Sequence, residues 1–305
     1  MRDFIQTIVD EVGQVLLGKE DKIQLALACL LSDGHLLIED LPGMGKTTLA
    51  QALARVLGLS HQRVQFTSDM LPADIVGVSI YNRDASRFEF HPGPVFTQLL
   101  LADEINRTTP KTQSALLEAM EERQVTLEGE TRLLDSPFFV IATQNPLSQM
   151  GTFPLPESQL DRFLMRISLG YPDPEAERQL YLGGDPRHKL AQLKVCLKPE
   201  QLSRIKQAAA QVKTSDSLLD YLQRLVHHTR QAPEFDVGLS PRGALALLRA
   251  AKTWAFMQGR SYVIVEDLQT LAEAVLGHRL VAPASGLEGH ASLMTKLLNA
   301  VDVVA

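Results

Sequence analysis

The sequence has only two cysteines and no excess of positive charge. Cys29 and Cys196 lie far apart among the 305 residues, in apolar segments with helical spacing. Two isolated cysteines of this kind predict buried thiols in a reducing compartment, and they argue against a disulfide or a cysteine-based metal site. The formal net charge is −6, so the chain as a whole lacks the basic character of a nucleic-acid-binding protein, although a total does not exclude a local basic patch.

Long uninterrupted hydrophobic runs are also missing. The first 20 residues contain acidic side chains and no apolar core followed by small residues, so they do not resemble a signal peptide. The long uncharged stretch within residues 136–157 is broken by Gln144, Asn145, Pro146 and Pro154, which argues against a transmembrane span. We therefore expect a cytoplasmic protein.

The length and composition fit a globular protein with two domains. Hydrophobic residues make up 45% and charged residues 22% of the chain, and its length allows two domains of roughly 100–200 residues each. Before residue 172, short apolar runs alternate with segments of helical spacing, which predicts an α/β fold with a parallel sheet flanked by helices. The predicted strands cover residues 36–38, 61–66, 97–102, 138–142 and 166–169.

The predicted helices of this first part cover residues 4–16, 22–31, 46–57, 110–123 and 156–164. Two segments depart from the alternation. Residues 70–96 indicate a short helix followed by a hairpin-like excursion, and residues 125–133 alternate around Glu128-Gly129-Glu130, which is a hairpin signal.

The chain changes character at Pro172-Asp173-Pro174, after which the segments are helical. The predicted helices cover residues 175–182, 199–212, 217–232, 241–258 and 265–276. We therefore predict an α/β nucleotide-binding domain over residues 1–171, a small helical domain over residues 172–280 and a helical tail over residues 281–305.

A glycine-rich turn separates the first predicted strand from the helix that follows it. Glycines let backbone N–H groups approach an anion, and the helix N-terminus adds a favourable partial charge. Lys46 supplies a positive charge for the β- and γ-phosphates, and the Thr47 hydroxyl can bind Mg²⁺. The strict pattern has glycine where this chain has Asp40, so an ordinary glycine turn is the alternative. The candidate nucleotide-binding residues of the turn are Pro42, Gly43, Met44, Gly45, Lys46, Thr47 and Thr48.

Polar residues also follow two later strands. Asp103 and Glu104 come after one, and Asn145 after another; the carboxyl ends of parallel strands form the ligand-binding edge of such a sheet. Asp103 is placed to hold Mg²⁺ together with Thr47, and Glu104 to polarise a water against the γ-phosphate. Asn145 can orient the same water. The alternatives are an acidic helix cap for the pair and a turn residue for Asn145.

Two arginines are candidates for stabilising charge on a transferred phosphoryl group. Arg162 precedes the last strand, where Arg166 competes for the role, and Arg242 starts a helix of the second domain. Such an arginine often comes from a neighbouring subunit. The alternative for each is a solvated surface arginine or an ordinary salt bridge.

Five segments, in their order and spacing, resemble the MoxR family of AAA+ ATPases. They are GMGKT, LLLADEINR, ATQNP, LPESQLDRF and GLSPRGA. The resemblance covers about residues 3–280 and leaves residues 281–305 outside it. It implies that residues 41–47 are Walker A and 99–104 Walker B, that Asn145 is sensor 1, Arg162 the arginine finger and Arg242 sensor 2, and that Gly18 lies near the adenine. Residues 74–95 resemble the helix-2 insert and residues 124–134 the pre-sensor-1 hairpin.

The family resemblance implies an ATPase that uses ATP and Mg²⁺ for mechanical work. It implies a ring, expected to be a hexamer, with nucleotide between the α/β domain and the helical lid and with Arg162 acting on the next subunit's nucleotide. The implied work is chaperone-like assembly or activation of protein complexes, or insertion of metal cofactors, often with a partner that has a von Willebrand factor A domain. A nucleic-acid-stimulated motor and a nucleotide-dependent switch or scaffold remain as alternatives. The acidic balance argues against the first and the intact Glu104 against the second.

Overall fold

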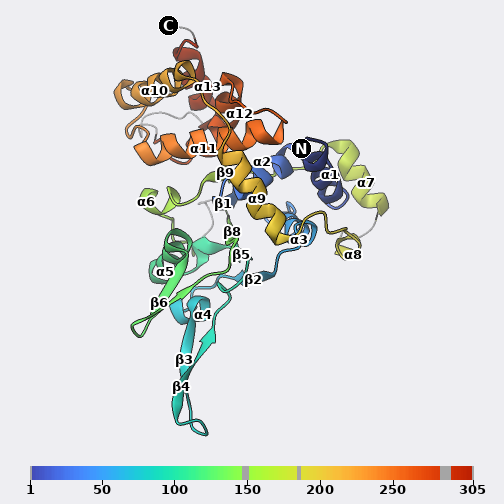
Figure 1. Cartoon of the computed structure of the whole chain (residues 1–305), viewed down its shortest axis with the longest axis vertical. Coiled ribbons are helices and arrows are strands. Elements are labelled where there is room, and N and C mark those ends of the chain that lie inside the picture. The colour runs from blue at the N-terminus through green and yellow to red at the C-terminus, as the bar shows by residue number, and fades with distance from the viewer. Residues whose placement is uncertain (1, 146–150, 184–186, 282–289, 304–305) are drawn as a thin grey trace.

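The computed structural model describes residues 2–145, 151–183, 187–281 and 290–303. The central sheet lies in the middle of the molecule, most of the helical C-terminal half lies at one end, and a long hairpin projects from the other end (Figure 1). Among the helices formed by these ranges, none is long and apolar enough to cross a membrane.

Five parallel strands form the sheet in the order β2-β5-β8-β1-β9. They are β1 (Leu36–Glu39), β2 (His61–Gln65), β5 (Leu99–Asp103), β8 (Phe139–Gln144) and β9 (Met165–Ile167). The inner strands β5, β8 and β1 are buried on both faces, which explains why they appear in the sequence as continuous apolar runs. The predicted α/β fold class is confirmed.

Alternate residues of each inner strand contribute to two separate hydrophobic cores. Leu36 and Ile38 face a core built with α1 (Arg2–Gly13), α2 (Glu20–Leu31) and α3 (Lys46–Val56). Leu37 faces the other core, which α4 (Pro72–Val76) and α5 (Pro110–Glu122) cover. The helices therefore lie on both faces of the sheet, as the sequence predicts.

Two small hairpins extend from the α/β part, as predicted. Strands β3 (Gly77–Asn82) and β4 (Arg87–Pro92) form the projecting hairpin of Figure 1. Strands β6 (Gln124–Leu127) and β7 (Glu130–Leu133) form the shorter one.

The second half of the described chain contains seven helices. They are α7 (Pro174–Gly183), α8 (Arg187–Leu190), α9 (Pro199–Ala210), α10 (Asp216–Gln231), α11 (Pro241–Met257), α12 (Val265–Leu276) and α13 (His290–Ala300). The hydroxyls of Ser215 and Ser240 accept N-terminal backbone N–H groups of α10 and α11. Leu247 on α11 belongs to the same buried cluster as Leu27 on α2, so the helical part packs directly on the α/β part.

A buried arginine fixes the end of α12 to the segment before β9. Arg279 is 5% exposed at its side chain. Its guanidinium donates to the carboxylate of Asp161 at 2.7 Å and to the carbonyls of Phe163 at 2.6 Å and Leu164 at 3.1 Å. His278 also bonds the Phe163 carbonyl, at 3.0 Å. The residues directly after α12 are therefore tied to the segment that leads into β9.

The structure corrects several local predictions. The helix expected over residues 156–164 is only α6 (Glu157–Leu160), and β9 begins one residue earlier than expected and ends at Ile167. The helix ends early because Phe163 and Leu164 are buried and the Leu164 N–H already donates to the His35 carbonyl beside β1. Helix α8 was not expected. Cys196 is half-buried in a loop, whereas Cys29 is buried in α2 as predicted; both thiols are free.

Candidate functional site

The glycine-rich turn connects the carboxyl end of β1 to α3. Gly43 and Gly45 have φ values of 87° and 91°, a left-handed conformation that favours glycine. A Cβ on Gly45 would also lie 2.8 Å from Leu16 Cδ1. Pro42 is exposed in this turn and Met44 packs against the core, while Thr47 and Thr48 are half-buried in the first turn of α3. The turn therefore presents backbone N–H groups at a helix N-terminus, where a phosphate binds well.

Two hydrogen bonds hold the Lys46 side chain beside the turn. Its ammonium donates to the Asp40 carbonyl at 2.7 Å and to Asn145 Oδ1 at 3.5 Å. Burial lowers the pKa of Lys46, and the negative charges of Asp103, Asp40 and Glu104 act in the opposite direction. A cation in this position is available to phosphate oxygens.

The acidic pair lies at the carboxyl end of β5, next to the turn. Asp103 accepts a hydrogen bond from the Thr143 hydroxyl at 2.6 Å and one from Arg63 at 2.7 Å. Glu104 has a left-handed backbone with φ 58°, and its N–H donates to the same Thr143 hydroxyl at 2.9 Å. Its side chain forms an ion pair with Arg107 at 3.1 Å. Thr143 on β8 therefore positions both acids, a role that the sequence did not indicate.

Asn145 connects the acidic pair to the lysine. Its Nδ2 donates to Glu104 Oε1 at 3.3 Å, and its Oδ1 accepts from Lys46. Asn106, which is fully buried, donates to the Asn145 carbonyl at 3.1 Å. The structure thus brings together Lys46, Glu104 and Asn145. Glu104 and Asn145 directly follow β5 and β8, and Lys46 begins the helix after β1.

The oxygen atoms near the turn fit a magnesium ion. Thr47 lies in the turn next to Lys46, and within the described chain its hydroxyl has no hydrogen-bond partner. Asp103 supplies a carboxylate at the neighbouring strand end. Hydroxyl and carboxylate oxygens are the ligands that Mg²⁺ prefers, so Thr47 and Asp103 stay the predicted metal ligands.

Asp40, which departs from the strict glycine pattern, has a clear structural role. It is 8% exposed. Its Oδ2 accepts the backbone N–H groups of Leu169 and Gly170, each at 2.7 Å, and the Ser168 hydroxyl at 3.1 Å. The carboxylate therefore fixes the start of the turn to the chain that leaves β9, and glycine could not do this.

Gly18 packs against the beginning of α7. Its φ is 66°, and a Cβ there would lie 2.7 Å from the carboxylate of Asp173 and 3.0 Å from Ala176. The neighbouring Lys19 donates to the Tyr171 carbonyl at 2.6 Å. The segment before α2 is therefore in contact with the start of the helical part, close to the predicted domain boundary.

Arg162 and Arg242 lie at the opposite edge of the sheet. Arg162 pairs with Glu121 at 3.0 Å and Arg242 pairs with the same carboxylate. Glu121 is at the end of α5. Residues that line the same pocket come directly before β1, β8 and β9, so they lie at the amino ends of these strands, whereas the nucleotide turn lies at the carboxyl end of β1. Arg242 therefore lies away from the nucleotide turn of its own chain. Arg166 instead pairs with Glu39 at 3.1 Å.

A five-stranded parallel sheet with a phosphate-binding turn, an acidic strand end and a helical lid defines an ATPase of the AAA+ type. The family described as "ATPase family associated with various cellular activities (AAA)" matches residues 35–165, and "AAA lid domain" matches residues 227–295.

Known proteins resemble the whole chain. The "Uncharacterized protein YeaC" of Bacillus subtilis is 44% identical over 97% of this chain and 93% of its own. The "Chaperone MoxR1" of Mycobacterium tuberculosis is 41% identical over 91% of this chain and 75% of its own. The crystal structure of a candidate ATPase from Cytophaga hutchinsonii superposes with a TM-score of 0.88 at 37% identity, covering 99% of this chain and 95% of that one. The chain belongs to the MoxR family of AAA+ ATPases.

Proposed function

We propose that the chain hydrolyses ATP in a Mg²⁺-dependent reaction and uses the energy for chaperone-like remodelling of protein complexes. The observation that carries the proposal is the contact of Glu104 with Asn145 and of Asn145 with Lys46 at the carboxyl edge of the sheet. These contacts join a candidate base, a polar sensor and a phosphate-binding cation in one site.

Each of these groups has a task in the proposed reaction. The N–H groups of the turn and the Lys46 ammonium bind the β- and γ-phosphates. Glu104 orients a water molecule for attack on the γ-phosphate and accepts its proton. Asn145 holds the Glu104 carboxylate in place and hydrogen-bonds the γ-phosphate or the water. Thr47 and Asp103 would hold Mg²⁺, which neutralises phosphate charge when it is bound.

The position of the two arginines supports a ring. Arg162 and Arg242 share the Glu121 carboxylate at the edge of the sheet opposite the turn. Strands of four to six residues at about 3.3 Å each separate the two edges. Both arginines therefore serve the nucleotide of a neighbouring copy in this proposal, which requires a closed ring, expected to be a hexamer.

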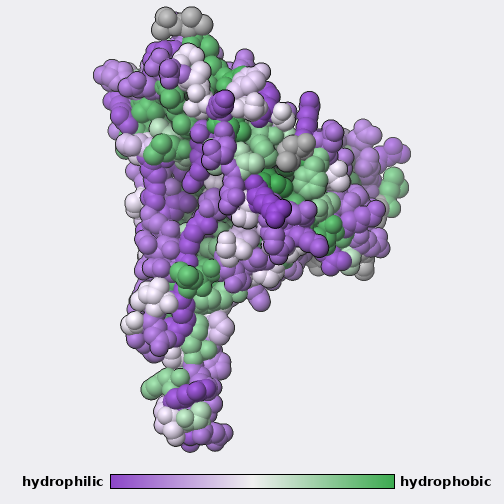
Figure 2. All heavy atoms as spheres, viewed as in Figure 1, coloured by the Kyte–Doolittle hydropathy of each residue, from purple (hydrophilic) through white to green (hydrophobic). Residues whose placement is uncertain are grey.

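The projecting hairpin gives the ring a place to contact other proteins. Ile80 is 52% and Phe88 67% exposed on it, and apolar atoms are visible on its surface (Figure 2). Exposed apolar side chains on a projecting element are typical of protein-binding surfaces. We propose that a protein client, a partner with a von Willebrand factor A domain, or both bind there in the cytoplasm, and that insertion of a metal cofactor is one form of the remodelling.

Two substitutions test the proposed reaction. Glu104→Gln should bind ATP but release phosphate at least about a hundredfold more slowly, and Lys46→Ala should lose most of its affinity for ATP. The measurements are phosphate release with and without Mg²⁺ and equilibrium binding of ATP. Wild-type turnover in Glu104→Gln would refute its role. Proteins that co-purify with Glu104→Gln in ATP, and not with Lys46→Ala, would be the candidate clients.

A further inference from the structure

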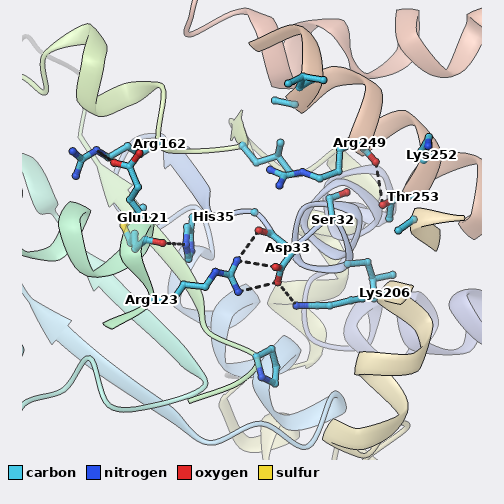
Figure 3. A pocket seen from close by; sticks show the side chains of 18 of the residues that line it. Ser32, Asp33, His35, Glu121, Arg123, Arg162, Lys206, Arg249, Lys252 and Thr253 are labelled. Atoms are coloured by element: carbon cyan, nitrogen blue, oxygen red, sulfur yellow. Dashed lines mark hydrogen bonds and ion pairs between the residues drawn. The ribbon is translucent and has the colours of Figure 1, made fainter. Parts of the chain in front are cut away.

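A large pocket lies between the α/β part and the helical part, at the edge of the sheet away from the nucleotide turn. Its volume is about 1160 Å³. The turn after α2, the end of α5, and helices α9 and α11 line it (Figure 3). Ligand pockets commonly have volumes of about 300–1,000 Å³, so there is room for a ligand of several charged groups.

Cations outnumber carboxylates among the side chains that line the pocket. Arg162, Arg242 and Arg279 pair with the carboxylates of Glu121 and Asp161. Four further cations line the pocket, and Asp33 is the one further carboxylate in its lining. These four cations are Arg123, Lys206, Arg249 and Lys252.

Asp33 is already fully paired. Arg123 contacts its carboxylate at 2.9 Å and Lys206 contacts it at 2.9 Å. These two cations hold the pKa of Asp33 below its usual value against the opposing effect of burial. The carboxylate therefore stays charged; its direct contacts are with Arg123 and Lys206, and it acts on Arg249 without a direct ion pair.

The two cations of α11 have no counter-ion of their own. Within the described ranges, neither the Arg249 guanidinium nor the Lys252 ammonium has a hydrogen-bond or ion-pair partner. Figure 3 shows the Arg249 side chain pointing toward the middle of the pocket, above Asp33. Burial lowers the pKa of Arg249, the charges of Asp33 and Cys29 act in the opposite direction, and Arg123 and Arg242 lower it further.

An independent feature also indicates a ligand. Ser32, 3% exposed, lines the same pocket, and its hydroxyl has no hydrogen-bond partner in the described structure. A buried hydroxyl without a partner costs free energy. A ligand with several acceptor oxygens would satisfy this donor and neutralise the unpaired cations together.

We propose that this pocket binds a small ligand with a chain of phosphate groups, such as a tripolyphosphate or the triphosphate of a nucleotide, separately from the glycine-rich turn. Arginine and lysine are the residues that bind phosphate oxygens best. The lining has seven cationic and three acidic side chains, an excess of four positive charges, which matches a multivalent phosphate better than a single carboxylate. The ligand would join α2 of the α/β part to α9 and α11 of the helical part.

The test is isothermal titration of inorganic tripolyphosphate into Lys46→Ala, in which the turn is disabled. We expect one equivalent to bind. Adding Arg249→Ala and Lys252→Ala should weaken this binding at least about tenfold, because each charged hydrogen bond to phosphate is strong. Arg204→Ala, an exposed cation of α9 outside the pocket, is the matched control and should change the affinity less than about twofold. ATP added as a competitor identifies the source of the phosphates: displacement indicates a nucleotide, and no displacement a free polyphosphate.

Other outcomes would overturn the proposal. These are no binding in Lys46→Ala, or equal binding with and without the α11 cations. A third is a loss of oligomers in Arg249→Ala/Lys252→Ala with unchanged tripolyphosphate binding, since the pocket would then be an interface between copies. A failure of the nucleotide turn is distinguishable, because ATP would then bind equally well to wild type and Lys46→Ala.

Discussion

A buried histidine should make the stability of the protein depend on pH. His35 is 5% exposed and lies directly before β1. Its Nδ1 accepts the Val140 N–H at 3.0 Å, so its Nε2 donates to the Met120 carbonyl at 3.1 Å. Both ring nitrogens are therefore used by the neutral imidazole, and a proton on Nδ1 would face a donor.

The size of the effect follows from the pKa. Burial lowers the pKa of His35 from 6.5 to about 4, while the Met120 carbonyl opposes the shift. The unfolded chain therefore binds a proton between pH 6.5 and 4 that the folded chain does not bind. Stability is complete above this window and is lost as the pH falls through it. With about 1.4 kcal/mol per pKa unit, the loss amounts to about 3 kcal/mol at pH 4.

The assay is urea unfolding between pH 7.5 and 4, compared for wild type and His35→Gln. Other groups also titrate in this range, so the difference between the two free energies of unfolding is the informative quantity. That difference should shrink by about 3 kcal/mol as the pH falls. His61→Gln, an exposed histidine of β2, is the control for removing an imidazole and should keep the wild-type slope. A difference that stays constant with pH would refute the assignment of a buried neutral imidazole.

Three further predictions follow from the candidate site. Asp40→Ala should lower the free energy of unfolding by about 2–4 kcal/mol, because its carboxylate satisfies two backbone N–H groups; a loss below about 0.5 kcal/mol in urea unfolding would contradict this. Thr143→Val should slow phosphate release about tenfold with little change in ATP binding, because the hydroxyl positions Asp103; unchanged turnover would show that this bond is dispensable. Mixing inactive Lys46→Ala with inactive Arg162→Ala should restore part of the ATPase activity, and no recovery at any ratio would indicate that Arg162 does not act between subunits.

The nucleotide edge could be predicted well because its signals are local. Lys46, Asp103 and Asn145 each follow an apolar run within a few residues. A parallel sheet brings the carboxyl ends of its strands to one edge, so strand order did not need to be known. The assignment of a parallel α/β fold was enough to place these three residues together, and the structure joins Lys46 and Asn145 directly.

The supporting contacts were not predictable in this way. In the sequence, Thr143 looks like an ordinary strand residue, but its role depends on Asp103, 40 positions away. Asp40 looks like a departure from a motif, but its role depends on a backbone N–H group 130 positions away. Helix α6 is short because Leu164 enters the sheet beside His35, 129 positions earlier in the chain. The spacing of residues within a segment cannot show that its backbone N–H groups will bond to a distant part of the chain instead of continuing a helix.

The sequence by itself therefore determined the fold class, the phosphate-binding turn and the acidic strand end, since these depend on strand-turn-helix patterns that fold locally. Only the tertiary structure decided where the helical part sits. Its packing on α2 places Arg242 beside Arg162 on Glu121, although Glu121 and Arg242 are 121 positions apart. The same packing leaves Arg249 and Lys252 without counter-ions in a pocket, because charges that look solvated in a helix pattern acquire their surroundings only when two distant surfaces meet.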